Sequence, residues 1–389
     1  MTSQPVRCAV VPPAPVPYRE PLFAYLARSE RVALRVIYQS SSTRAWDQPR
    51  EWFPRRHAYD AVHLDAHHRP RTGRTPVTVP RDLGKALAAF NPDVVVCSEF
   101  GLPTLRALAW CHRRGRALLI LTEVTAQVEQ ALPTSKRLLH RWLAGRADGF
   151  IAVSSRARDR LVRMGVAPGS VEVSLQSADL EPIRAAAAER RPAPGHSPLR
   201  LLAVGRLVPD KNYADLIDAM AAAGLGPELA VLHIHGVGPL AGQLRERASE
   251  AGVSVTFQDH SPPAALASAY AAADVFVLVS TYEPFGVVVR EAVAAGLPLI
   301  CSECAGAVDD FAFEGRNALL VDPERPTSLA QALERVCRDS ALRASLAAGS
   351  RAVDAEHPFA RDVAAFERAI LRAAGSAPPA ASQPVGSAS

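Results

Sequence analysis

The sequence predicts an α/β protein with two successive, doubly wound parallel-sheet domains of similar size. From residue 81 onward, short apolar segments alternate with segments of helical length, and a second series of the same kind begins near residue 199. This alternation is typical of a parallel sheet covered by helices on both faces. Between the series, residues 190–198 have the proline-rich composition of a linker. We therefore expect an N-terminal domain at 1–181, a linker at 182–198 and a C-terminal domain at 199–357.

The first domain opens with an apolar strand that runs directly into a proline-rich loop, residues 12–17. Its strands are expected at Val6–Val11, Val32–Tyr38, Asp93–Cys97, Ala117–Leu121 and Gly149–Val153. Its helices are expected at Leu22–Ala27, Asp82–Phe90, Leu102–Arg113, Ser135–Arg146 and Arg156–Met164. Residues 46–68 carry several Trp and His residues. We expect an insertion there, on the side of the molecule that binds the second substrate, called the acceptor below. Metal ligation by these histidines is the alternative, although their spacing matches no ligand pattern.

The second domain repeats the alternation more regularly. Its strands are expected at Leu199–Val204, Ala230–His235, Ser254–Phe257, Val275–Val279, Leu297–Cys301 and Ala318–Val321. Its helices are expected at Tyr213–Ala222, Leu240–Ala251, Pro263–Ala271, Val287–Ala295, Leu329–Ala347 and Ala360–Ala373. We expect the helical segment 358–375 either to end this domain or to return to the first, and residues 376–389 to be disordered. The ligand site should lie at the carboxyl ends of the strands, where the two domains face each other.

Charge is distributed unevenly along the 389 residues. The chain has a net charge of +5, which combines +11 over residues 1–190 with −6 over residues 191–389. A basic half would suit an anionic acceptor or peripheral contact with the inner face of a membrane. The alternative is a compositional preference for arginine, because only three of the 44 cations are lysine. No apolar run approaches a membrane span and no signal peptide is evident, so we expect a cytoplasmic protein without a nucleic-acid partner.

The basic helix expected at Ser135–Arg146 has two interpretations. Its apolar residues gather on one side and its cations lie elsewhere; they are Leu138, Leu139, Trp142 and Leu143 against Lys136, Arg137, Arg141 and Arg146. Such a helix either lies on a membrane surface or turns its apolar face to the core. We favour the core-facing interpretation, because it is the more common origin of this pattern.

Two glutamates frame the start of one predicted helix in the second domain. Glu283 precedes the helix and Glu291 lies inside it. The amides of Phe285, Gly286 and Val287 would be first-turn N–H groups without intrahelical partners, which form an anion site. A carboxylate, an anion site and a second carboxylate in this order suit a sugar, a diphosphate and a ribose. The alternative is a surface helix with two solvated glutamates.

A basic segment, Val204-Gly-Arg-Leu-Val-Pro-Asp-Lys-Asn212, follows the first strand of the second domain. Gly205 permits a tight exit from the strand, and Arg206 and Lys211 bring two cations to the carboxyl edge of the sheet. Arginine binds phosphate oxygens in pairs and lysine acts as a point charge. The alternative is a solvated loop that happens to hold two cations.

Four segments together resemble the large retaining glycosyltransferase family 4. They are Val204–Asn212, Gly236-Val-Gly-Pro239, the Glu-x7-Glu segment Glu283–Glu291, and Gly315–Pro323. These motifs follow the order and spacing of the family across residues 199–323, whereas the first domain matches more loosely, chiefly through residues 147–154. The resemblance implies a GT-B fold, in which two Rossmann-like domains hold a nucleotide sugar in the cleft between them.

The same resemblance assigns roles to the residues of the second domain. It places Arg206 and Lys211 on the donor diphosphate, Glu283 on the sugar hydroxyls and Glu291 on the ribose. Arg206, Lys211 and Glu283 would also serve catalysis. The remaining donor-binding positions are Gly205, Gly236, Phe285, Gly286 and Val287. The family retains anomeric configuration and usually needs no metal, and this sequence has no Asp-x-Asp pair to hold one. We expect no metal and no cofactor beyond the donor substrate.

The first domain departs from the family pattern in two places. A proline-rich loop replaces the glycine-rich loop that often follows the first strand, and residues 119–125 hold Thr122 and Glu123 where many members have a histidine. Glu123 would orient the acceptor hydroxyl or accept its proton, or it is a structural carboxylate. Tyr18 and Arg19 are candidates for the acceptor side, and Glu99 is a weaker one.

We therefore expect a retaining, metal-independent hexosyltransferase. It would move a hexose or aminohexose from a nucleotide sugar, with UDP favoured over GDP, to a saccharide, lipid-linked or small-molecule acceptor. Bacterial cell-surface glycan or natural-product biosynthesis is the expected setting. The alternatives are a degenerate GT-B protein that binds a nucleotide sugar without turnover, and a GT-B sugar-nucleotide epimerase or hydrolase.

Overall fold

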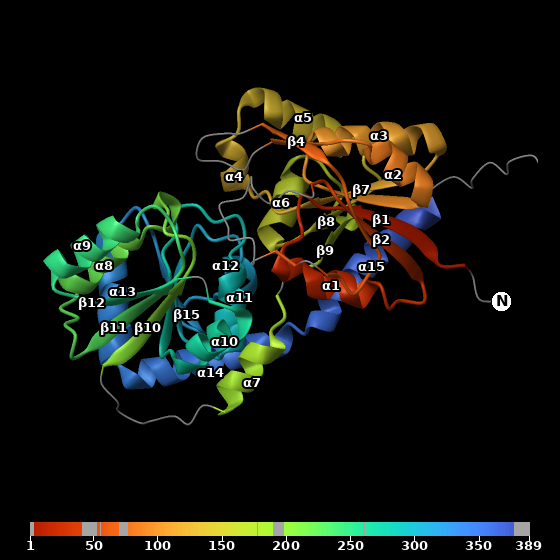
Figure 1. The fold of residues 1–389 in the computed structure, drawn as a ribbon. Helices are drawn as coiled ribbons and strands as arrows, with labels where there is room; N and C mark the ends of the chain where they lie inside the picture. The colour runs from red at the N-terminus through yellow and green to blue at the C-terminus, as the bar shows by residue number, and fades with distance from the viewer. Residues whose placement is uncertain are drawn as a thin grey trace, which may run out of the picture. The chain divides into compact units, whose positions relative to one another are not determined.

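The computed structural model describes residues 4–40, 53–54, 56–69, 77–176, 178–189, 198–259 and 261–376. The chain divides into two compact units (Figure 1). Unit 1 contains the described residues of 1–153 and 157–175 together with those from residue 360 onward. Unit 2 contains residues 154–156 and the described residues of 176–359.

Unit 1 is built on a parallel seven-stranded sheet with the strand order β3-β2-β1-β6-β7-β8-β9. Its strands are β1 (Val6–Val11), β2 (Val32–Tyr38), β3 (Ala61–His63), β6 (Val94–Ser98), β7 (Ala117–Thr122), β8 (Gly149–Ala152) and β9 (Val171–Val173). A separate antiparallel ribbon joins β4 (Ala66–Arg69) to β5 (Val77–Pro80). The apolar runs of β6, β7 and β8 are buried along their whole length, as expected for strands covered on both faces.

Helices enclose this sheet, and one of them comes from the far end of the chain. They are α1 (Glu20–Leu26), α2 (Leu83–Phe90), α3 (Leu102–Arg114), α4 (Ala126–Gln130), α5 (Thr134–Ala144), α6 (Ser155–Arg163) and α15 (Phe359–Ser376). The last helix packs into unit 1 through Phe366 and Ile370, both fully buried. Leu175 N–H donates to a carboxylate oxygen of Asp362 in α15 at 3.1 Å, and Ser174 Oγ donates to the carbonyl of the same residue at 2.9 Å.

Unit 2 is built on a parallel six-stranded sheet with the strand order β12-β11-β10-β13-β14-β15. Its strands are β10 (Leu199–Val204), β11 (Ala230–His235), β12 (Ser254–Gln258), β13 (Val275–Leu278), β14 (Leu299–Ser302) and β15 (Ala318–Val321). Its helices are α7 (Glu181–Glu189), α8 (Tyr213–Ala222), α9 (Ala241–Ala251), α10 (Pro263–Ala272), α11 (Val287–Ala294), α12 (Val308–Phe311), α13 (Pro326–Arg338) and α14 (Ser340–Glu356). The predicted α/β class with two Rossmann-like sheets is confirmed.

Several elements differ from those predicted. Residues 181–189 form α7, which packs against α10, so the first half of the predicted linker is helical. The helix predicted at residues 329–347 is two helices, because Asp339 leaves the helical conformation and caps α14 with a hydrogen bond from Leu342 N–H at 2.9 Å. Trp46, Trp52, residues 190–197 of the predicted linker and the predicted tail from residue 377 lie outside the described residues.

No helix in the described part of the chain is both long enough and apolar enough to cross a bilayer.

Replacement of Phe366 by alanine should lower the free energy of unfolding by about 3–5 kcal/mol, because it opens a cavity beneath α15. Chemical denaturation followed by circular dichroism measures this loss. The control is Arg361→Ala at an exposed position of the same helix, where we expect a change within about 0.5 kcal/mol. Equal, small effects of the two substitutions would contradict the placement of α15 in the core of unit 1.

Candidate active site

Two loops meet at the carboxyl edge of the sheet in unit 2. The loop after β10 carries Lys211 and the loop after β13 carries Glu283, and the Lys211 ammonium forms an ion pair with the Glu283 carboxylate. Each of the two side chains is only 14% exposed. A backbone bond supports the same junction, since Thr281 N–H donates to the Asp210 carbonyl at 3.0 Å. Residues 72 positions apart in the chain thus form one shielded, charged site.

The loop after β10 folds back so that Lys211 lies over Gly205. A Cβ atom at Gly205 would lie 3.2 Å from the Lys211 Cε atom and 2.9 Å from the Tyr213 hydroxyl. Glycine is therefore required for this loop shape, as the sequence suggests. Tyr213 Oη and Ser280 Oγ are buried and have no hydrogen-bond partner among the described residues.

Arg206 is exposed at the site, whereas Gly236 is packed against a neighbouring loop. The Arg206 side chain is exposed and forms no ion pair in the described part of the chain, so its guanidinium is available at the sheet edge. Gly236 lies against the chain itself, because a Cβ atom there would lie 1.9 Å from the Gly205 carbonyl oxygen. The structure thus accounts for Gly236 by close packing of the loops after β10 and β11.

The predicted helix after β13 begins as the sequence suggests. Gly286 has a left-handed conformation with φ of 91° at the start of α11, a conformation that glycine adopts at little cost. The amides of Gly286 and Val287 donate to no acceptor among the described residues, as is usual at a helix N-terminus. Phe285 is itself buried, so only its backbone is available at this site.

A neighbouring loop holds the segment before α11 in place. Gly306 N–H donates to the Glu283 carbonyl at 3.0 Å, and Ala307 N–H donates to the Phe285 carbonyl at 2.8 Å. A Cβ atom at Gly306 would lie 1.9 Å from the Pro284 carbonyl oxygen, so a larger residue would displace the segment. The sequence analysis did not identify Gly306, because its contact partner is about twenty residues away in the chain.

Glu291 lies on α11 with a partner that the sequence analysis missed. The Tyr270 hydroxyl of α10 donates to Glu291 Oε2 at 2.7 Å. Burial raises the pKa of the Glu291 carboxyl, and the bond from Tyr270 lowers it again in part. The other carboxylate oxygen makes no hydrogen bond within the described residues and is free to accept one.

Unit 1 gathers a second polar cluster at the carboxyl edge of its own sheet. Arg19 lies 3.7 Å from Glu123 and donates to Ser98 Oγ at 3.4 Å. Glu99 accepts hydrogen bonds from Thr122 Oγ1 at 2.9 Å and from Glu123 N–H at 2.7 Å. The cluster combines the predicted acceptor-side residues Arg19, Glu99 and Glu123 at the ends of β6 and β7.

Glu99 is the unusual member of this cluster. Its φ of 60° places a residue other than glycine in the left-handed region, a strain that is concentrated at functional sites. Burial, followed by the charge of nearby Glu123, raises its pKa to about 7. Glu99 was the weaker sequence candidate, yet it combines backbone strain with a perturbed carboxyl group.

A further network surrounds Glu20 at the start of α1. Glu20 Oε1 accepts from the hydroxyls of Tyr59 at 2.6 Å and Tyr38 at 3.0 Å, and Glu20 Oε2 accepts from His57 Nδ1 at 2.9 Å. His57 Nε2 lies 3.1 Å from His63 Nε2. Burial raises the pKa of both tyrosines, which keeps them as hydrogen-bond donors. The network joins His57 and Tyr59, which precede β3 and lie in the predicted acceptor-side insertion, to the start of α1.

No three His, Cys, Asp or Glu side chains converge in the described part of the chain in a way that could hold a metal ion. Cys301 is buried, Cys304 is half-buried, and both are free thiols.

Each unit is similar in sequence to a known kind of domain. Residues 187–353 match the family model "Glycosyl transferases group 1", and residues 22–174 match "Glycosyl transferase 4-like domain". The glycogen synthase of Mycobacterium tuberculosis is 30% identical over 226 residues, which cover 58% of this chain and 54% of that protein. The D-inositol 3-phosphate glycosyltransferase of Corynebacterium kroppenstedtii is 28% identical over 263 residues, covering 62% of this chain and 57% of that protein. The chain thus spans about half the length of the curated relatives that it matches.

The fold has solved counterparts as well. The Anabaena protein HepE, crystallised with UDP, superposes with a TM-score of 0.73 at 18% identity, over 95% of this chain and all of that one. At this level of identity the likeness establishes the fold alone, and that fold is GT-B.

The raised pKa of Glu99 predicts a pH-dependent stability. Above the ordinary carboxyl pKa, the unfolded chain releases this proton while the folded chain keeps it up to about pH 7, so the group costs stability as pH rises from about 4.5 to 7. The side chain in Glu99→Gln cannot ionise. We therefore expect the free energy of unfolding of this variant, relative to wild type, to rise by on the order of 1–3 kcal/mol between pH 5 and pH 8. Denaturant titrations at both pH values measure the change. If the difference in unfolding free energy between Glu99→Gln and wild type were the same at both pH values, the raised pKa of Glu99 would be contradicted.

Proposed function

From the two glycosyltransferase domains of this GT-B chain, we propose that it transfers a hexose or aminohexose from a nucleotide sugar to an acceptor hydroxyl, with retention at the anomeric carbon. The family matches support a transferase, because both units match glycosyltransferase models. The structure of HepE with UDP favours UDP over GDP as the donor nucleotide. Saccharide, lipid-linked and small-molecule acceptors all fit this reaction, in cell-surface glycan or natural-product biosynthesis.

The shielded Lys211–Glu283 pair beside the first turn of α11 is the observation that carries the proposal. In our proposal, Lys211 and the exposed Arg206 bind the donor diphosphate, and the free amides of Gly286 and Val287 bind it from the helix end. Negative charge grows on the diphosphate as the bond to the sugar breaks. These fixed positive groups stabilise that charge, which is the main contribution such a site makes to the rate.

The two glutamates then bind the ends of the donor. Glu283 is held close to the diphosphate site by Lys211 and would accept hydrogen bonds from sugar hydroxyls. Glu291 keeps one oxygen on Tyr270 and would offer the other to a ribose hydroxyl. Neither role needs a metal ion, in keeping with the proposed metal-independent reaction.

The acceptor would be bound by the polar cluster of unit 1. We assign Glu123 to orienting the acceptor hydroxyl, with Arg19 as its partner and Tyr18 nearby in the chain. Glu99, with a pKa raised to about 7, could accept the hydroxyl proton near neutral pH, which is the range in which a general base works best. A protein that binds the donor without turnover is the second candidate, because the first domain departs most from the family pattern.

Donor binding should weaken in two variants. Lys211→Ala and Glu291→Ala each remove a charged hydrogen-bonding group, and we expect each to raise Kd for the nucleotide sugar by about 10–100-fold. Calorimetric titration with UDP- and GDP-sugars measures this effect and identifies the nucleotide. Lys85→Ala, at an exposed lysine paired with Asp82 in unit 1, is the control and should leave Kd unchanged. Unchanged affinity in both site variants would rule out the proposed donor site.

Transfer should depend on Glu123 while donor binding does not. We expect Glu123→Ala to bind the donor as wild type does but to transfer the sugar about 100-fold more slowly, in line with the loss of one acid–base or orienting group. Assays of transfer and of donor hydrolysis, run beside the calorimetric titration, measure both properties. If wild type binds the donor but neither hydrolyses nor transfers it with any acceptor class, the protein is a nucleotide-sugar binder and the enzyme assignment fails.

A further inference from the structure

Two large apolar side chains of α5 face solvent. Leu138 is 60% exposed and Trp142 is 44% exposed, and their spacing of four residues places them side by side on one helix face. The helix packs against unit 1 through His140 and Leu143, which are buried. The core-facing interpretation that we favoured for this helix is therefore wrong for Leu138 and Trp142. Large apolar side chains that are exposed next to each other indicate a surface that binds a partner or a membrane.

Positive charge surrounds this apolar pair. Arg141 is exposed and forms no ion pair in the part of the chain that the structure describes. The Arg146 guanidinium lies over the Trp142 ring at 4.1 Å, and Arg137 donates to Thr134 Oγ1 at 3.2 Å. The outer face of α5, as we use the term below, consists of Arg137, Leu138, Arg141 and Trp142 of the helix and of Arg146 just beyond its C-terminal end.

Negative charge is absent from the same stretch of sequence. Residues 130–147 include four cations and neither Asp nor Glu. The flanking carboxylates are already engaged: Glu129 pairs with buried Arg160 at 2.9 Å, and Asp148 accepts from Leu118 N–H at 2.7 Å. Arg141 also acts on the Glu129 carboxylate, but that carboxylate is already bound to Arg160, so positive charge predominates on the outer face.

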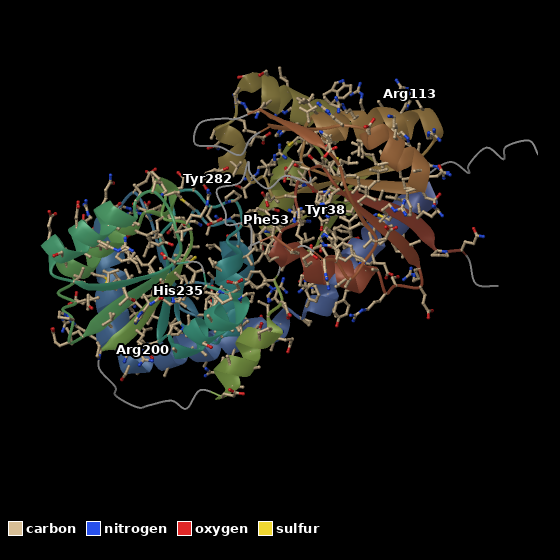
Figure 2. The ribbon with its side chains drawn as sticks, in the orientation of Figure 1. Tyr38, Phe53, Arg113, Arg200, His235 and Tyr282 are labelled. Atoms are coloured by element: carbon tan, nitrogen blue, oxygen red, sulfur yellow. The ribbon has the colours of Figure 1, made fainter. Side chains whose placement is uncertain are left out.

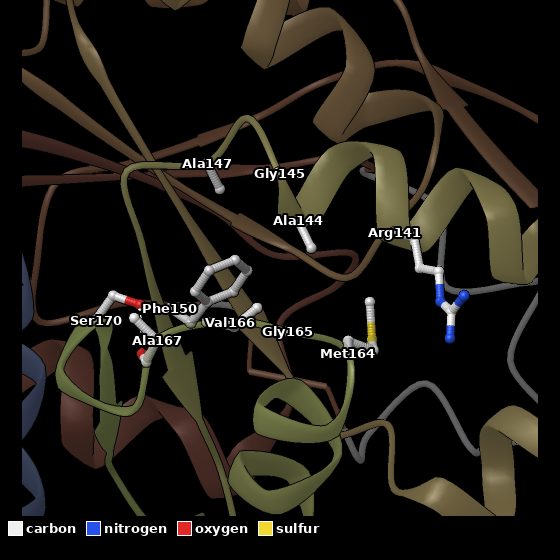
Figure 3. Close-up of a pocket in the computed structure, with 10 residues that line it drawn as sticks. All are labelled: Arg141, Ala144, Gly145, Ala147, Phe150, Met164, Gly165, Val166, Ala167 and Ser170. Atoms are coloured by element: carbon white, nitrogen blue, oxygen red, sulfur yellow. Dashed lines mark hydrogen bonds between the residues drawn. The ribbon is translucent and has the colours of Figure 1, made fainter.

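A small cavity lies beside the C-terminal end of α5. Its volume is about 240 Å³, and Arg141 lines it together with Phe150, Met164 and Ser170. Figure 3 shows Arg141 and Met164 on one side of the cavity and Phe150 with Ser170 on the other. The space is smaller than most cofactor sites but is large enough for a phosphate-bearing head group next to a cation.

We propose that the outer face of α5 docks the protein onto an anionic lipid surface. Leu138 and Trp142 enter the interfacial region, where Trp is favoured, and the three arginines contact lipid phosphates. The uniform positive charge selects an anionic bilayer, because a second copy of this chain would bring like charges together. This docking does not rest on the proposed sugar transfer, since no residue of the outer face belongs to the donor site.

Vesicle co-sedimentation of the full chain tests the proposal. We expect binding to vesicles that contain phosphatidylglycerol in phosphatidylcholine, and at least about tenfold weaker binding to pure phosphatidylcholine. The double variant Leu138→Ser, Trp142→Ser should bind anionic vesicles at least about tenfold more weakly. The double variant Arg137→Gln, Arg141→Gln should bind anionic vesicles about 25-fold more weakly in low salt and be less sensitive to added NaCl, because each arginine contributes about fivefold to the affinity.

A matched control comes from α1 of the same unit. Tyr25 is 52% exposed and lies beneath the Arg28 guanidinium, so Tyr25→Ser, Arg28→Gln removes the same kinds of group from another face. We expect this variant to bind vesicles as wild type does. Failure of wild type to bind anionic vesicles, or undiminished binding by both α5 variants, would overturn the proposal. Self-association of wild type that the α5 variants lose, without any lipid binding, would assign the face to a second copy and also overturn it. Circular dichroism and nucleotide-sugar titration of each variant report folding and the donor site separately.

Discussion

The ion pair between Lys211 and Glu283 is the interaction on which the candidate donor site depends. It links the loops after β10 and β13, two neighbouring parallel strands whose carboxyl ends share one edge of the sheet. Removal of either partner would leave a charge in a site that is 14% exposed, which is costly unless a ligand replaces the partner. In a pair of this kind, each charge has a partner when no substrate is bound. Each can exchange that partner for a charged group of the substrate.

Backbone packing fixes where that pair lies. Gly236 and Gly306 each lie so close to a carbonyl oxygen of a neighbouring loop that no side chain fits. They hold the loop after β10 and the segment before α11 in position, so the charged side chains need little reorganisation when a donor binds. The sheet edge of unit 1 differs, because Glu99 has a strained backbone conformation there and lies near the Glu123 carboxylate. The candidate donor site is thus held by close backbone packing, whereas the polar cluster of unit 1 contains a carboxyl group with a raised pKa.

Most sheet strands and the tight loop after β10 could be predicted from the sequence because their signals are local. Apolar runs mark β6, β7 and β13, and glycine with nearby cations marks the loop after β10. Tertiary partners could not be predicted. Tyr270 binds Glu291 from another helix, and Gly306, after β14, contacts Pro284, after the neighbouring strand β13. The strands β3, β4, β5 and β9 were missed because each is only three or four residues long and gives no apolar run. The exposure of Trp142 also depends on how α5 packs, which helical periodicity alone does not determine.

The central claim is that the carboxyl edge of the sheet in unit 2 holds a nucleoside diphosphate. Hydrogen–deuterium exchange of the full chain, measured with and without a saturating UDP-sugar, tests it most directly, because the amides at the start of α11 have no acceptor among the residues that the structure describes. The account predicts slowed exchange in peptides that cover residues 205–212 and 283–291, with unit 2 strands such as β12 unchanged. Binding of the UDP-sugar without protection of either peptide, or with protection confined to other segments, would contradict it.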